Sequence, residues 1–293
     1  MIKDMTEGHP ASILLKFAMP MILSGIFQQL YNVVDSVVAG KYAGVDALAA
    51  VGASYPVAML FIAIATGSGI GCAVVVSQLF GAKKIAQMKC AIMTAIISIV
   101  VLALVVMTIG YITCNFLITL LNTPENIFDD SALYLRIYVY GIMFLFLYNI
   151  ATSIYNGLGD SKTPLYFLIF SSVLNIILDV VFVKDLKMGV AGVAWATFIA
   201  QGISSVLSLG NLMLRLKKIE TEESYKKFDF DILKHMSKIA LPSIFQQSTI
   251  AIGQLGVQAL VNSFGSIVIA GYSAAIKIDS FFKVPIQTMS NAV

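Results

Sequence analysis

Long apolar runs follow one another along almost the whole chain, separated by short polar segments. The runs are continuous, and each predicts a helix long enough to cross a bilayer, which needs about 20 apolar residues. The alternating pattern of an outer-membrane barrel strand does not occur. The pattern therefore predicts an all-α polytopic membrane protein. Eight spans are expected, at 11–40, 47–80, 90–117, 132–158, 164–183, 190–214, 232–264 and 267–293.

The composition supports a membrane location. Apolar residues make up 58% of the 293 residues and charged residues 12%, about half the charged share of an average soluble domain. With a mean hydropathy of +0.88, too little polar surface remains to cover a water-soluble protein of this size. The three cysteines lie in or beside apolar runs without paired spacing, which indicates small apolar side chains and neither disulfides nor a metal site. These features argue against a soluble enzyme.

Lysine and arginine are unevenly divided between the two ends of the predicted spans. Thirteen of them fall on the side of the N-terminus, and four fall on the other side, namely Lys41, Arg136, Lys184 and Lys187. Cytoplasmic loops are enriched in Lys and Arg. We therefore expect a cytoplasmic N-terminus in a multi-pass protein of the inner (plasma) membrane.

The predicted seventh span repeats features of the first. The segment KFAMP, which ends at Pro20, recurs 222 residues later as KIALP, which ends at Pro242. A rival match of the two FQQ segments loses both the proline and the helix end, so we prefer the first alignment. Because six spans separate the copies, they share one orientation. Parallel repeats of this kind occur in secondary transporters, whose sites lie at the repeat interface.

The repeat predicts three parts of the chain. A first six-helix lobe covers 1–214, a cytoplasmic linker covers 215–231, and 232–293 form the first two helices of an incomplete second lobe. The linker carries charges of both signs, which is typical of a solvated segment, and no binding role is expected for it. Because the second copy stops after two spans, we expect either a fragment or a chain that has lost four spans.

Carboxylates inside apolar spans are the first functional candidates, since a charge at the bilayer centre costs about 2.5–3.5 kcal/mol on insertion scales. Asp35 lies deep in the first span, and Gln28, Tyr31 and Asn32 precede it by seven, four and three residues. Side chains at this spacing share one helix face. The stripe predicts a cavity or substrate surface that includes Asp35. The alternative is that Asp35 caps a broken helix.

A second group of polar residues occupies the fifth and sixth spans. Asn175 and Asp179 are four residues apart, and so are Thr197 and Gln201, which makes each pair neighbours on one helix face. Their carboxylate, amide and hydroxyl oxygens suit a hard monovalent cation or a shared proton. The alternative is that Asp179 merely lies near the outer interface, beside basic residues.

Two backbone features inside the spans predict local geometry. Pro20 removes a backbone hydrogen bond, so a hinge is expected there, although membrane helices commonly tolerate proline. The run Gly67 to Gly71 has the look of a nucleotide loop, but it lies inside an apolar span with no strand before it. Close helix packing by small residues is the expected role of these glycines.

Four segments, in order over six spans, resemble the multidrug and toxic compound extrusion (MATE) family of antiporters. They cover the visible chain but only about the first two-thirds of a typical member. The segments are Asp35 with AG at 39–40 and ALAAVG at 47–52, GLGDSKTP at 157–164, NIILD at 175–179, and GVAGVAWAT at 189–197.

The resemblance implies a V-shaped pair of helical bundles that exports small lipophilic organic cations in exchange for Na⁺ or H⁺ by alternating access. It implies a cation or proton site at Asp35, Asn175, Asp179 and Thr197. Some members also use an acidic residue in the seventh span. The position that matches Asp35 there is Val257, so the resemblance does not extend to that residue.

Three other functions remain open from sequence alone. A flippase for lipid-linked precursors has a related two-lobe architecture, but its central cavity should be strongly cationic, whereas the basic residues here cluster in cytoplasmic loops. A membrane enzyme needs an intramembrane His or a nucleophile and base, and no such pair is evident, so no catalytic residue is expected. The third alternative is an inactive truncated chain. Apart from the coupling ion we expect no cofactor, no nucleic acid and no obligate protein partner.

Overall fold

The structure is a computed structural model that describes residues 10–121, 123–219, 221, 224–262 and the isolated positions 264, 275, 276, 279, 282, 283 and 288. Within these residues it is an all-helical bundle without strands, as predicted. In chain order the elements are α1 (Pro10–Val38), η1 (Ala39–Ala43), α2 (Val45–Gly81), α3 (Ile85–Leu120), α4 (Glu125–Tyr140), α5 (Ile142–Gly157), α6 (Lys162–Asp179), η2 (Val180–Asp185), α7 (Gly189–Lys218) and α8 (Phe230–Asn262).

The first six predicted spans coincide with membrane-length helices. Five helical segments are long and apolar enough to cross a membrane, and the bent pair of α4 and α5 makes a sixth if it is counted as one span. Helix α8 matches the predicted seventh span but is not among these segments, so its crossing of a membrane stays a prediction. The predicted eighth span, 267–293, lies outside the described residues apart from isolated positions.

The fourth predicted span is broken, which the apolar pattern did not indicate. Helices α4 and α5 meet at Gly141 with a bend of 50°. A Cβ atom on Gly141 would lie 3.1 Å from the Tyr138 carbonyl oxygen, a contact tighter than side chains normally make. Glycine therefore permits the bend, and the apolar residues on both sides explain why the run looked continuous.

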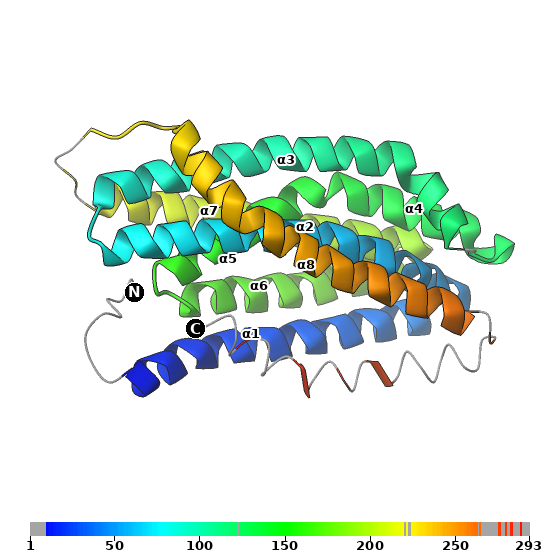
Figure 1. Cartoon of the computed structure of the whole chain (residues 1–293). Helices are drawn as coiled ribbons and strands as arrows, with labels where there is room; N and C mark the ends of the chain where they lie inside the picture. The colour runs from blue at the N-terminus through cyan, green and yellow to red at the C-terminus, as the bar shows by residue number, and fades with distance from the viewer. Residues whose placement is uncertain are drawn as a thin grey trace.

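The main core joins α2, α3, α5 and α7, with contributions from α4 and α8. Helix α1 lies along one edge of the bundle and α3 along the opposite edge (Figure 1). In its most apolar stretch α1 is only 11% buried, whereas the corresponding figure for α2 and α7 is 50%. Within the described chain, α1 is therefore the most lightly packed of these three helices.

Helix α8 crosses α2 at the glycine-rich segment (Figure 1). A Cβ atom on Gly67 would lie 2.7 Å from the backbone of Ile244, and one on Gly71 would lie 2.7 Å from the Cβ atom of Ala240. Real Cβ atoms do not approach other atoms so closely, so only glycine allows this crossing. The prediction of close helix packing is confirmed.

The segment between α7 and α8 is attached to α3, where the sequence predicted only a solvated linker. The buried Lys89 ammonium donates a hydrogen bond to the Ile219 carbonyl (2.5 Å) and lies 5.6 Å from the centroid of the Tyr225 ring. Nearer α8, the Asp229 N–H donates to Thr94 Oγ1 (3.0 Å). These long-range contacts could not be read from the local charge pattern.

Candidate functional site

Two carboxyl groups from different helices meet inside the bundle. Asp35 lies near the end of α1, and Asp179 is the last residue of α6. Their side chains are close enough to share a hydrogen bond. Asp179 is fully buried and Asp35 is half-buried. The structure thus brings together the two carboxylates that the sequence singled out, and it buries Asp179 instead of exposing it at an interface.

Asn175 and Thr197 connect this pair to α7. Asn175 is buried one turn before Asp179 on the same face of α6. With its amide oriented to match its neighbours, Asn175 donates to Asp179 Oδ2 (2.8 Å) and accepts from the Thr197 N–H (3.1 Å). The hydroxyl of Tyr31 from α1 lies close to the Thr197 side chain and near both carboxyl groups. Five predicted residues therefore form one cluster across α1, α6 and α7, which we call the carboxyl-pair cluster.

Tyr134 is a neighbour of this cluster that sequence reasoning missed. It projects from α4, is 8% exposed, and lies within electrostatic range of both Asp35 and Asp179. Its ring stacks on Tyr138, with 6.3 Å between the ring centroids. The four-residue spacing of these two tyrosines in an apolar span was the available signal.

Three predicted cavity residues are not joined to the cluster. Gln28 is exposed, and Asn32 and Gln201 are half-buried. In the described part of the chain, none of them hydrogen-bonds Asp179, Asn175 or Thr197. A shared helix face places side chains in one direction but does not determine which of them reach a neighbouring helix.

Helix α1 continues through Pro20 from Pro10 to Val38. Pro20 is buried, and its carbonyl accepts a hydrogen bond from Ser24 Oγ (2.9 Å). A proline inside a helix removes one intrahelical hydrogen bond even where the helix does not break. The predicted hinge therefore stays a prediction, at a turn where the helix lacks one backbone bond.

The carboxyl-pair cluster can hold a small cation. Two carboxylates in contact repel one another strongly in a buried environment, so such a pair is stable when it holds a proton or a cation. Asp179 forms no ion pair with any residue that the structure describes. Nearby amide and hydroxyl groups supply further polar contacts. The arrangement is suited to the reversible uptake of one small positive ion.

A second buried carboxyl lies in the turn between α5 and α6. Asp160 accepts hydrogen bonds from the Thr163 N–H (3.1 Å) and Thr163 Oγ1 (2.7 Å), and it forms an ion pair with Arg215. Burial raises the pKa of Asp160, but the hydrogen bonds from Thr163 and Arg215 outweigh burial and lower the pKa below its ordinary value. Arg215 was expected in the solvated linker; instead it belongs to the last turn of α7.

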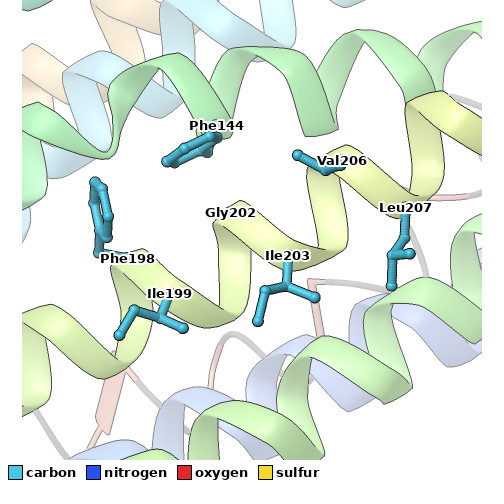
Figure 2. A pocket seen from close by; sticks show the side chains of 7 residues that line it. All are labelled: Phe144, Phe198, Ile199, Gly202, Ile203, Val206 and Leu207. Atoms are coloured by element: carbon cyan, nitrogen blue, oxygen red, sulfur yellow. The ribbon is translucent and has the colours of Figure 1, made fainter.

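An apolar hollow of about 360 Å³ lies between α5 and α7 (Figure 2). None of its lining residues belongs to the carboxyl-pair cluster, and none of them is titratable. The hollow is therefore separate from the candidate ion site. Its lining consists of Phe144, Phe198, Ile199, Gly202, Ile203, Val206 and Leu207.

Two curated relatives align with almost the whole chain. The probable multidrug resistance protein YoeA of Bacillus subtilis (strain 168) is 32% identical in an alignment 288 positions long that covers 94% of this chain and 61% of YoeA. The probable multidrug resistance protein YpnP of the same organism is 30% identical over 290 residues, which are 99% of this chain and 65% of YpnP. The chain therefore spans less than two thirds of the length of these relatives.

A solved structure shares the fold. The outward-facing conformation of a multidrug resistance MATE family transporter of the MOP superfamily superposes with a TM-score of 0.88 at 25% identity, over 97% of this chain and 63% of the other. The family model MatE matches residues 20–181, a range that includes Asp35, Asn175 and Asp179. Because this match covers more than half of the sequence, the chain belongs to the MatE family of multidrug and toxic compound extrusion proteins.

Proposed function

We propose that the complete protein exports small lipophilic organic cations across the plasma membrane in antiport with H⁺ or Na⁺. The observation that carries the proposal is the contact between Asp35 on α1 and Asp179 on α6. Family membership supports transport of drug-like compounds, and the carboxyl pair supports coupling to a small cation. The asymmetry of Lys and Arg supports a cytoplasmic N-terminus.

The coupling step follows from the charges of the pair. Uptake of H⁺ or Na⁺ from outside reduces the repulsion between Asp35 and Asp179, which favours the approach of α1 to α6. Release of the ion towards the cytoplasm restores the repulsion and separates the two helices. Because α1 is lightly packed, its change of shape costs few contacts within the described chain. Alternating access would use this change to open and close the path of the organic cation.

The membrane potential drives such a cycle when more positive charge enters than leaves. One elementary charge that crosses 100 mV releases about 2.3 kcal/mol. A tenfold concentration gradient of a solute corresponds to about 1.4 kcal/mol. Entry of two coupling ions for each exported monovalent cation therefore supports an outward gradient of more than tenfold, whereas one-for-one exchange moves no net charge and is driven by the concentration gradient of the coupling ion.

The test is export of a fluorescent organic cation from cells that produce the complete protein, with imposed H⁺ or Na⁺ gradients. We expect Asp35→Asn and Asp179→Asn each to lower export by at least about tenfold, since a neutral amide cannot exchange the coupling ion. Asp185→Asn is the matched control, because Asp185 is exposed at the end of η2. Immunodetection in the membrane fraction verifies insertion of each variant. Undiminished export by Asp35→Asn would overturn the proposal.

A further inference from the structure

We propose that Ser161 is a positioning residue that fixes the cytoplasmic end of α1, so that the less buried segment at 21–37, with Asp35, moves against a stationary N-terminal segment. The role of Ser161 in transport rests on the proposed function, whereas its hydrogen bond to α1 does not. Ser161 is 5% exposed and lies in the turn between α5 and α6. Its hydroxyl donates a hydrogen bond to the Phe17 carbonyl of α1 at 2.8 Å.

The burial pattern of α1 shows two points of attachment. Phe17, Ala18 and Pro20 are buried near its start, and Val38 is buried at its end. None of the residues from 21 to 37 is buried within the chain. Helix α1 is thus held at both ends and lightly packed between them. The carboxyl-pair cluster takes its α1 residues from the lightly packed segment.

The bond from Ser161 is made on the cytoplasmic side of the weakest turn of α1. Pro20 has no N–H, so the Lys16 carbonyl lacks its ordinary intrahelical donor. The Ser161 hydroxyl reaches the very next carbonyl, that of Phe17. A tertiary hydrogen bond at this place ties the segment before Pro20 to the bundle. A bend at Pro20 then moves the segment that follows the proline.

Ser161 is itself held on a rigid support. The neighbouring Asp160 is fixed by Thr163 of α6 and by Arg215 of α7. The Arg215 guanidinium lies 5.5 Å from the ring centroid of Tyr155, whose hydroxyl donates to Asn211 Oδ1 (2.9 Å). Three helices therefore fix the turn that presents the Ser161 hydroxyl. Such a support can resist a force that bends α1.

The test uses spin-label distances in the complete protein. A label pair at positions 15 and 84 reports on the base of α1, and a pair at positions 30 and 120 reports on the lightly packed segment. The native residues at all four positions are exposed, and the three native cysteines are buried. In the wild type we expect a change of pH or Na⁺ concentration to shift the second distance and to leave the first unchanged.

Variants at Ser161 separate positioning from general packing. Ser161→Ala should broaden and shift the distance at the base under all conditions, and Ser161→Thr, which keeps the hydroxyl, should restore the wild-type distribution. Ser205→Ala is the matched control, since Ser205 is buried and its hydroxyl bonds to the Gly202 carbonyl of its own helix (2.9 Å). Export should fall in Ser161→Ala and recover in Ser161→Thr.

Two results would overturn the proposal. One is an unchanged distance between the labels at positions 15 and 84 in Ser161→Ala. The other is full export although that distance shows that the start of α1 is no longer held. Hydrogen exchange of the wild type gives a test that needs no variant to fold. Amides at 13–19 should exchange more slowly than those at 21–37, and equal rates would also overturn the proposal. If the label distance at the start of α1 responds to the Ser161 variants as expected but even the wild type exports nothing, the proposed function fails. The role of Ser161 in fixing α1 then stands.

Discussion

Asp160 and Asp179 lie at opposite ends of α6, and both are almost completely buried. Asp160 faces the guanidinium of Arg215 and accepts two hydrogen bonds from Thr163. Asp179 instead faces the carboxyl of Asp35. Burial of a carboxyl therefore does not by itself indicate a site for a mobile ion. The charge of the facing group separates a permanent structural contact from a reversible one.

This difference predicts opposite consequences for stability. A carboxylate paired with arginine stabilises the fold, because the loss of one partner leaves a buried charge without compensation. A carboxyl beside another carboxyl is held in place by the surrounding packing, and ionisation of both groups lowers the free energy of unfolding. Measurements of stability and of its pH dependence test this contrast.

The largest effect is expected from Asp160→Asn. We expect it to lower the free energy of unfolding by about 2 kcal/mol, since Thr163 and the partly exposed Arg215 would lose their buried charged acceptor. Asp179→Asn should change the free energy by less than about 1 kcal/mol, or increase it, because it removes a like-charge contact. Chemical unfolding in detergent measures both variants. Equal losses would contradict the contrast between the two carboxyls.

The second prediction concerns pH. Because the pKa of Asp160 is lower in the folded protein than its ordinary value of 3.8, its ionised form stabilises the fold. This contribution is complete above the unfolded pKa and is lost as the pH falls through the folded pKa. The difference in melting temperature between the wild type and Asp160→Asn should thus be constant near pH 7 and shrink below about pH 4. A difference that grows on acidification would refute the assignment.

A smaller loss than that of Asp160→Asn is expected from Tyr155→Phe. The substitution removes the hydroxyl that bonds to Asn211 but keeps the ring beside Arg215. We expect a loss of about 1 kcal/mol, the usual contribution of one hydrogen bond. Thermal unfolding measures it, and the exposed Tyr166→Phe is the control. A loss as large as that of Asp160→Asn would show that the Tyr155 hydroxyl holds α7 at this turn as strongly as the ion pair does.

Several elements could be predicted from the sequence because their causes are local. Apolar runs of membrane length predict helices, since a backbone in lipid must satisfy its own hydrogen bonds. The rarity of charge inside such runs singled out Asp35 and Asp179 as candidates. The spacing of Asn175 and Asp179 predicted their contact, because four residues make one helical turn. Gly67 and Gly71 likewise indicated close helix packing.

Other features depend on how the helices pack, and no local pattern contains that information. The hydrogen bond between Ser161 and Phe17 joins residues 144 positions apart. The ion pair of Asp160 with Arg215 and the attachment of the linker through Lys89 also join distant helices. Local sequence is sufficient to locate the first six membrane-length helical segments and the polar groups that are costly in lipid. Which of these groups compensate one another depends on the distances between helices, so the packing of the bundle settles it.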